Sequence, residues 1–376
     1  MEQGRTGGRI DVIDGLCGFA ILCVLYTHTI GRLTEPGWRQ GFSVFGFSVS
    51  PLTLLSNTGY AVTIFLILSG YVLARPYAQG TKQMDTLQNA CAFWKGRALR
   101  LIPAYYVALM LFLTIAAPDI HPKQTLLHGI LFSTFTFIFT DWFPTLTVAQ
   151  MPAYIPLWYI GVLFWMCFLF PFLLYMIRRI GLWKTVSAIT LLSILSRLYV
   201  SSFYRFYDFH GVMQNFSVLG RMDDFVFGMA LAFLHANGSK PACLIGRSLS
   251  GFLSIIAGFL LSDIVRLKET PFFTTAFAQL AVSIGMILLI DAILRSPIHM
   301  QKFLSPWPLR LLGRMSYSIY LLHGAAIPSL LPMLNPIRFL RYLGLVFAVS
   351  WLSYRTIEFG STKNWKDLLP KRYEKS

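Results

Sequence analysis

The apolar stretch at residues 10–31 is long enough to cross a membrane, yet it carries ionisable side chains near both ends, Asp14 and His28. Ionisable groups inside a membrane helix are costly and usually face a protein or water interior, so they mark candidate functional sites. A neutral imidazole can take a proton from a hydroxyl at physiological pH, which makes His28 a candidate general base. The alternative is a buried histidine that only hydrogen-bonds to a helix carbonyl.

Helical geometry places Asp14, Cys17 and His28 on one face, because positions about 11 or 14 apart fall within about 40° of each other. At about 1.5 Å per residue, Asp14 and His28 lie roughly 21 Å apart along the axis. They therefore mark opposite ends of one path and are not a contact pair. We expect Cys17, which lies on the same face, to line that path.

A second candidate site is the segment FWKGRALRLIPAYY, in which Arg97 and Arg100 are three residues apart. At this spacing two helical side chains point to the same side. Guanidinium groups offer paired donors to phosphate oxygens, so this pair suits a phosphate or pyrophosphate at the cytoplasmic mouth of a helix. The alternative is anchoring of a membrane helix by long basic side chains that reach toward lipid headgroups.

The segment GRMDDFVFG carries two adjacent acids at the entry to a helix. Arg221 can pair with Asp224 at i,i+3, and we expect this structural bridge here, not an acid/base pair. The sequence contains no Gly-rich phosphate loop, zinc-ligand spacing or G-x-S-x-G elbow. We therefore expect no metal site.

Near the end of the chain, the segment RMSYSIYLLHG holds Ser316, Tyr320 and His323 at intervals of four and three, and RTIEFG holds Glu358. The first three share one helix face and can present hydroxyls and an imidazole to a cavity. Each of them also fits an ordinary interhelical hydrogen bond.

Composition identifies a polytopic membrane protein. Of the 376 residues, 55% are hydrophobic and 13% are charged, whereas soluble domains average about a quarter charged residues. The net charge of +16 lies in short clusters between apolar runs, as the positive-inside rule predicts, and forms no basic patch for nucleic acid. The five cysteines include no C-x-x-C pair and are expected to be reduced. The polar start of the chain does not resemble a signal peptide, so we expect the first helix to be retained.

Eleven apolar runs are candidates for membrane helices: 11–31, 51–74, 97–117, 124–140, 157–178, 184–203, 217–235, 248–265, 273–294, 309–330 and 338–357. Basic clusters favour two cytoplasmic termini, which requires an even number of crossings. The 124–140 run is the shortest, and we expect it to be re-entrant or partly embedded. The sequence thus predicts an all-α, multi-pass membrane bundle with about ten spanning helices plus that segment. Residues 1–360 form a single domain, and residues 361–376 form a short basic cytoplasmic tail.

Six segments resemble, in this order, the landmarks of the acyltransferase-3 family of membrane acyltransferases: DGLCGFAILCVLYTH (14–28), FLILSGYVL (65–73), GRALRLIPAYY (96–106), LWYIGVLFW (157–165), RMDDFVFGMALA (221–232) and GRMSYSIYLLH (313–323). The resemblance covers almost the whole chain. It implies a helix bundle that moves an acyl group, commonly acetyl, from cytoplasmic acyl-CoA to a hydroxyl of a carbohydrate or similar acceptor. By position, His28 matches the essential first-helix histidine of the family, and Arg97 and Arg100 match its paired arginines, which are thought to engage the acyl donor.

Two positions depart from the family pattern. Cys17 stands where the family usually has an arginine, and Leu163 in WYIGVL stands where the motif WSLxxE has its glutamate. Loss of a cation and an anion together can remove a neutralising pair and leave the bundle stable, or it can mark the loss of acyl transfer. Cys17 could instead act as a thiol acyl carrier, although a thiol in an apolar helix forms little thiolate.

We therefore expect an inner-membrane O-acyltransferase, with acetyl-CoA as co-substrate and no bound cofactor, that modifies a glycan or glycolipid. In this reading Arg97 and Arg100 hold the CoA phosphates, His28 deprotonates the acceptor, and Asp14 organises the cytoplasmic end of the path. We expect membrane lipid but no nucleic acid as a partner, and transfer completed within the bundle or handed to a separate protein. The second candidate is a catalytically silent relative that binds or moves a lipid-linked glycan. A secondary transporter is a third, although nothing suggests two matched halves.

This topology predicts that the chain near Thr145 faces the outside of the cell membrane. A cysteine at this position, in a background without the five native cysteines, should react with a membrane-impermeant maleimide added to spheroplasts. A cysteine in place of Ser376, in the cytoplasmic tail, serves as the control and should react only after permeabilisation. Strictly cytoplasmic labelling of the Thr145→Cys variant would contradict the topology.

Overall fold

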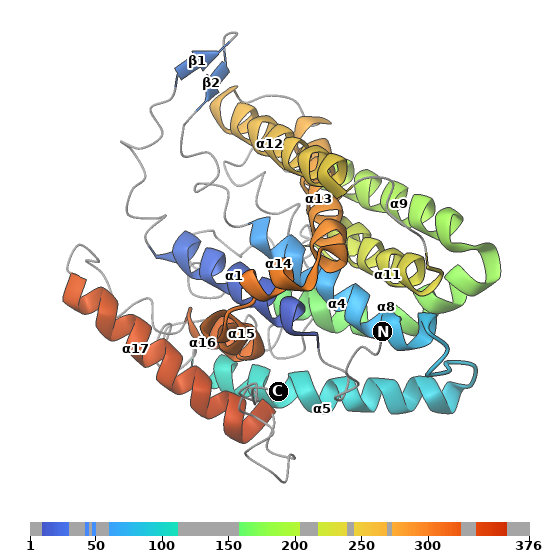
Figure 1. The fold of residues 1–376 in the computed structure, drawn as a ribbon, viewed down its shortest axis with the longest axis horizontal. Coiled ribbons are helices and arrows are strands. Elements are labelled where there is room, and N and C mark those ends of the chain that lie inside the picture. The colour runs from blue at the N-terminus through green and yellow to red at the C-terminus, as the bar shows by residue number, and fades with distance from the viewer. Residues whose placement is uncertain are drawn as a thin grey trace.

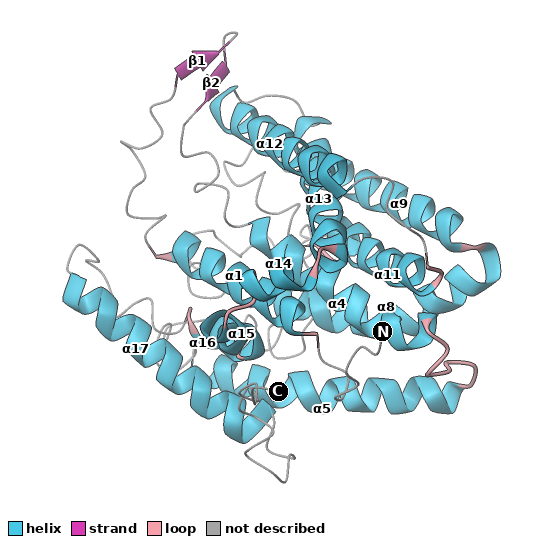
Figure 2. Ribbon diagram, in the orientation of Figure 1, coloured by secondary structure: helices cyan, strands magenta, loops and turns pink. Residues whose placement is uncertain are grey.

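The structure, a computed structural model, describes residues 10–29, 42–44, 47–49, 60–111, 158–203, 217–238, 244–268, 273–324 and 336–358. Figures 1 and 2 show the helical bundle formed by these residues, with a small two-stranded ribbon at one edge. The helices are α1 (Asp11–His28), α4 (Ala61–Ala78), α5 (Leu87–Leu111), α8 (Trp158–Ile180), α9 (Leu182–Phe203), α11 (Met222–Ala236), α12 (Leu244–Lys268), α13 (Phe273–Arg295), α14 (Ile298–Phe303), α15 (Trp307–Arg314), α16 (Ser316–Leu322) and α17 (Pro336–Ser353). A 3-10 turn, η7 (Leu219–Arg221), precedes α11, and a π-helical turn, η9 (Tyr354–Glu358), follows α17.

The ribbon is a departure from the expected all-α class. It consists of β1 (Phe42–Val44) and β2 (Phe47–Val49), which pair antiparallel. The helical class is otherwise confirmed in the part of the chain that the structure describes. Within that part, five helices are long and apolar enough to cross a membrane; they lie at Asp11–His28, Ala61–Ala78, Tyr159–Ile180, Leu244–Leu261 and Ala276–Arg295. The number of ten crossings stays a prediction, and both the 124–140 segment and Thr145 lie outside the described residues.

The lipid-facing character of the bundle is visible in its surface. Large apolar side chains are exposed along several of the long helices, among them Phe172 and Tyr175 of α8, Leu195 of α9 and Leu249 of α12. Exposure of these large apolar side chains fits contact with lipid. The membrane class expected from composition agrees with this surface.

Two expected helices differ from the helices that form. α5 begins at Leu87, ten residues before the expected 97–117 run, and the hydroxyl of Thr86 accepts a hydrogen bond from the backbone N–H of Asn89 at 3.2 Å, as an N-cap does. Because α5 begins at Leu87, Arg97 and Arg100 lie in its interior and not at its mouth. Hydropathy detects only the apolar part of such a helix and therefore missed its start. The continuous helix expected at 309–330 is also wrong, because the chain is interrupted at Met315 and α16 ends at Leu322.

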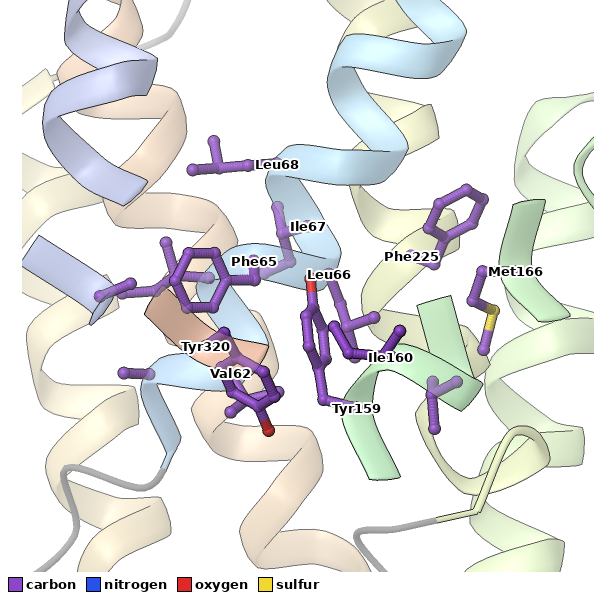
Figure 3. Packing of buried hydrophobic residues seen from close by; sticks show 14 of the residues in the cluster. Val62, Phe65, Leu66, Ile67, Leu68, Tyr159, Ile160, Met166, Phe225 and Tyr320 are labelled. Atoms are coloured by element: carbon purple, nitrogen blue, oxygen red, sulfur yellow. The ribbon is translucent and has the colours of Figure 1, made fainter. Parts of the chain in front are cut away.

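A close backbone contact in the core joins α4 to α11. A Cβ atom added to Gly70 would lie 2.0 Å from the carbonyl oxygen of Phe225, and one added to Gly228 would lie 1.9 Å from the carbonyl oxygen of Ile67. Both glycines therefore allow the two backbones to touch, as small residues do between membrane helices. Figure 3 shows the apolar side chains of α4, including Leu66, packed against this contact and against α8.

A fully buried ion-pair network stands beside this contact. Arg197 of α9 donates to both carboxylate oxygens of Asp223 at 2.5 and 2.6 Å, and neither side chain is exposed. The expected i,i+3 bridge is confirmed, since Arg221 Nε lies 3.2 Å from Asp224 Oδ2. Gln279 of α13 also contacts Asp224. These acids are held by cations, as buried charges must be, and they tie α9, α11 and α13 together.

The α4–α11 contact predicts that Gly228→Ala destabilises the fold. The new methyl group would meet backbone, so the helices must separate, at a cost of about 1–3 kcal/mol. Gly344→Ala on α17 is the matched control, because its Cβ would meet no atom within 4 Å, and alanine favours a helix over glycine by about 1 kcal/mol. In thermal unfolding of the purified variants in detergent, Gly228→Ala should unfold at a lower temperature than Gly344→Ala. Equal unfolding temperatures would contradict the close contact.

Candidate active site

The first half of α1 is held against the segment that contains α14 and α15. A Cβ atom on Gly18 would lie 2.0 Å from the carbonyl oxygen of Leu309, and one on Gly313 would lie 1.7 Å from the carbonyl oxygen of Asp14. Backbone contact of this kind fixes α1 in both position and rotation. Because α1 is continuous from Asp11 to His28, this anchorage also determines where His28 lies at its other end.

The acidic residues at the start of α1 are paired with α15. Asp14 accepts a hydrogen bond from Arg314 Nε at 2.9 Å, and Asp11 pairs with Arg310. The side chains of Asp14 and Arg314 are only 9% and 10% exposed, so this is an interior ion pair. The expected separation of Asp14 from His28 along one helix is what the structure shows, and the contacts of Asp14 described here are those of a structural pair. Its expected role at one end of a path stays a prediction.

His28 lies at the last residue of α1 and meets His323, which directly follows α16. The Nδ1 atom of His28 is 3.2 Å from the Nε2 atom of His323, and the two rings stack with centroids 5.0 Å apart. His28 is half-buried, whereas His323 is fully buried. The structure thus brings together two histidines that are 295 positions apart in the chain.

The face of α16 that was expected to line a cavity is largely buried in the bundle. Tyr320 is 2% exposed, and its ring lies edge-on to Tyr159 of α8 at 4.9 Å, next to Phe65 and Val62 in Figure 3. Its ring is also 5.5 Å from that of His323. Ser316, at the first residue of α16, is half-buried. A cavity-lining role for Ser316 and Tyr320 stays a prediction.

The arginines of α5 lie in different surroundings. The guanidinium group of Arg97 stands over the ring of Phe93, 5.8 Å from its centroid, and its side chain is half-buried. Arg100 is 43% exposed and lies 3.5 Å from Oε1 of Glu358, which is 1% exposed on its side chain. Because this guanidinium group is exposed, an anion can approach it from outside.

Glu358 connects Arg100 to α16. Its second oxygen accepts a hydrogen bond from the hydroxyl of Ser318 at 3.2 Å. The hydroxyl of Tyr317 also donates to the backbone carbonyl of Leu101 at 2.6 Å, next to Arg100. α16 therefore contacts α5 through two side-chain hydrogen-bonding links, and it contacts α1 through the histidine pair. Figure 1 shows α16 among α1, α5 and α17.

Cys17 and Leu163 are the two residues that depart from the family pattern. Cys17 of α1 and Leu163 of α8 are both half-buried and pack against the main apolar core. Cys17 is eleven residues before His28, which corresponds to about 16 Å along a helix. A thiol in that place cannot exchange a proton directly with the imidazole.

Sequence reasoning named His323 and Glu358 but missed their partners. The partner of His323 is His28 in the first helix, and that of Glu358 is Arg100 in α5, 258 positions earlier. Helical periodicity relates only residues within a few turns, so no local pattern could have paired them. The available signal was the placement of ionisable residues in apolar helices.

The fold and this site define a class of protein: a helical membrane protein with an interior imidazole pair and a partly exposed arginine pair on adjoining helices. Comparison with known families is more specific. The acyltransferase-3 family model, described as an acyltransferase domain, matches residues 10–355. The chain belongs to this family, which confirms the resemblance carried by the six motifs.

The chain is also similar to the peptidoglycan O-acetyltransferase OatA of Listeria monocytogenes serovar 1/2a (strain ATCC BAA-679 / EGD-e). The two are 27% identical over 376 residues, which cover 94% of this chain and 56% of the relative. The chain thus spans a little more than half the length of that relative. No solved structure matches the chain significantly.

The site geometry predicts that Asp14→Asn acts on stability. Among the described residues, removing the Asp14 charge leaves Arg314 with the more distant Asp11 at 3.9 Å. Loss of the hydrogen-bond partner of a largely buried donor should cost about 1–3 kcal/mol. Asp85→Asn is the control, because Asp85 pairs with Arg178 on the surface, with side chains 55% and 37% exposed, and such pairs contribute less than about 1 kcal/mol. In thermal unfolding in detergent, Asp14→Asn should lower the unfolding temperature more than Asp85→Asn. If Asp14→Asn unfolds at the wild-type temperature, the pair has no structural role.

Proposed function

We propose that the chain is a membrane O-acetyltransferase that moves an acetyl group from acetyl-CoA to a hydroxyl group of a cell-surface glycan or glycolipid. The family supports acyl transfer. The name of the similar Listeria protein supports acetyl as the acyl group and makes peptidoglycan one candidate acceptor. The proposal includes an inner-membrane location with both termini in the cytoplasm, as the clusters of basic residues favour.

The observation that carries the proposal is the half-buried imidazole of His28 at the end of a membrane helix, held in place by a second, fully buried imidazole at 3.2 Å. General base catalysis needs an unprotonated nitrogen near neutral pH and a fixed position. A lone surface histidine has the first property but not the second. The pair supplies both, and its half-exposed member is the one that a substrate can reach.

The reaction balances with these groups. The acceptor hydroxyl gives its proton to His28 as its oxygen attacks the thioester carbon, so an O–C ester bond forms and the C–S bond breaks. The protonated imidazole then returns the proton to the departing CoA sulfur, which leaves as the thiol. His28 ends in its starting state, so one residue serves as base and then as acid.

The arginines of α5 are the proposed donor site. Arg100 keeps an exposed guanidinium group while Glu358 holds it from the buried side. The phosphates of CoA would approach Arg100 from outside and meet Arg97 three residues away on the same helix. Arg97 is itself braced by the ring of Phe93, and cation–π contact restricts the motion of a guanidinium group.

An acyl-cysteine route through Cys17 has less support. The thiol lies about 16 Å along α1 from His28, and no base in the proposed scheme reaches it. Direct transfer needs neither a thiolate in an apolar helix nor a second carrier. Asp14 is assigned a supporting role at the same end of α1 as Cys17, through its pair with Arg314.

Acetyl ester analysis of the host's surface glycans tests the function. A strain that lacks the gene should lose an O-acetyl ester, and wild type should restore it. His28→Ala should restore less than about a hundredth, the usual range for loss of a general base, at equal membrane abundance. His299→Ala, at an exposed position of α14, is the control and should restore it fully.

Two outcomes would contradict the proposal. Full restoration by His28→Ala would remove His28 from the reaction. An ester content that does not depend on the gene at all would favour the catalytically silent relative that binds or moves a lipid-linked glycan.

A further inference from the structure

The end of α16 determines the protonation of the His323 ring. α16 ends at Leu322, and the last carbonyl groups of a helix have no partner within it. The side chain of His323 folds back toward this end, with Nδ1 2.7 Å from the carbonyl oxygen of Tyr320 and 3.2 Å from that of Ile319, which also accepts the backbone N–H of His323. A carbonyl oxygen only accepts hydrogen bonds, so Nδ1 of His323 carries a hydrogen.

The position of the hydrogen on His323 also determines which nitrogen of His28 is protonated. A neutral imidazole has one N–H group and one bare nitrogen, so in neutral His323 the Nε2 atom is the acceptor. It lies 3.2 Å from Nδ1 of His28, which must then be the donor. The remaining nitrogen of His28, Nε2, is therefore the unprotonated one. In free histidine the opposite tautomer, with the hydrogen on Nε2, is the more common form.

We propose that His323 is a positioning residue that holds His28 in the Nδ1–H tautomer and so leaves Nε2 of His28 as the basic nitrogen. The tautomer follows from the contacts of the two rings. Its consequence for catalysis rests on the proposed function, in which that nitrogen takes the proton of the acceptor hydroxyl.

Burial agrees with this division of roles. His323 is 0% exposed and contacts backbone on one side and His28 on the other, so it is enclosed as an orienting group should be. His28 is half-buried, so it is the member that a substrate can approach. In hydrolases of the Ser-His-Asp type, a carboxylate accepts a hydrogen bond from Nδ1 of the catalytic histidine. Here the imidazole of His323, itself held by a backbone carbonyl, takes the place of that carboxylate.

The helices that carry the two rings add an electrostatic contribution. His28 is the last residue of α1, and His323 directly follows α16. The C-terminal end of a helix carries a partial negative charge and favours a cation nearby. The positive charge that forms on His28 when it takes a proton therefore develops where two such ends meet.

Nitrogen-15 NMR of the full chain in detergent micelles, with labelled histidine, tests the tautomer directly at a pH where the rings are neutral. The His28 signals are assigned by their loss in His28→Gln. In wild type, Nδ1 of His28 should show the shift of a protonated nitrogen and Nε2 that of a bare one. The opposite pattern would overturn the proposal.

Variants at position 323 separate orientation from packing. In His323→Ala the acceptor is lost, so His28 should revert to mainly the Nε2–H form. In His323→Gln the amide oxygen can accept from Nδ1, so the wild-type tautomer should be retained. His299→Gln, on the exposed face of α14, should change neither signal. An Nδ1–H tautomer that persists in His323→Ala would show that something other than His323 holds it.

Transfer kinetics supply an independent readout. His323→Ala should lower kcat by about 10²–10⁴-fold, the range seen when a catalytic histidine is held in the wrong tautomer, with little change in the KM for acetyl-CoA. His323→Gln should recover most of the lost kcat. If wild type transfers no acetyl group, the proposed function fails while the NMR result still decides the tautomer. If kcat is equal in wild type and His323→Ala, the positioning role is wrong.

Discussion

The hydrogen bond from His323 to the carbonyl of Tyr320 is the interaction on which the site depends. Inside a membrane, a backbone carbonyl that a helix leaves without an internal partner must find another donor. α16 is only seven residues long, so such carbonyls lie within the bundle and not at its surface. The side chain that satisfies one of them also contacts His28. The residue that caps the end of this short helix therefore also orients the imidazole of His28 in α1.

The position of α16 explains why such a short element can control the site. It is joined to α5 by Tyr317 and Glu358 and to α1 by the histidine pair. α1 is in turn fixed by backbone contact at Gly18 and Gly313. The helix with the proposed donor arginines and the helix with the proposed base therefore both contact α16. A shift of α16 would change the positions of both groups. Orienting groups held by packed, hydrogen-bonded neighbours give the fixed geometry that group transfer needs.

Most of the helical fold could be predicted from the sequence because long apolar runs have few alternatives in a membrane. α8, α9, α12 and α13 match their expected ranges within a few residues. The start of α5 could not be found in the same way, since its first ten residues are polar enough to fall outside any hydropathy window. The interruption at Met315 was missed for the opposite reason. Apolar residues stand on both sides of it, and Arg310 and Arg314 of α15 pair with the acids at the start of α1.

The sequence could name candidate residues of the site but not the contacts between them. Residue type and spacing single out His28, Arg97 and Arg100 as candidates, and their roles stay predictions. The structure places the two arginines in the interior of α5 and not at its mouth. The pairs His28–His323 and Arg100–Glu358 join distant parts of the chain. Periodicity within one helix carries no information about which face of another helix it will meet, so these pairs require the three-dimensional fold.

The departures from the family pattern at Cys17 and Leu163 weigh less against catalysis once the contacts are known. The contacts described for His28 and Arg100 are made by other residues. The imidazole is held by His323, and the anion beside Arg100 is Glu358, which approaches from the π-helical turn after α17. Cys17 and Leu163 instead pack against the apolar core, where an uncharged pair avoids the cost of burying two opposite charges. The contacts described for the proposed catalytic groups are therefore made by residues other than Cys17 and Leu163.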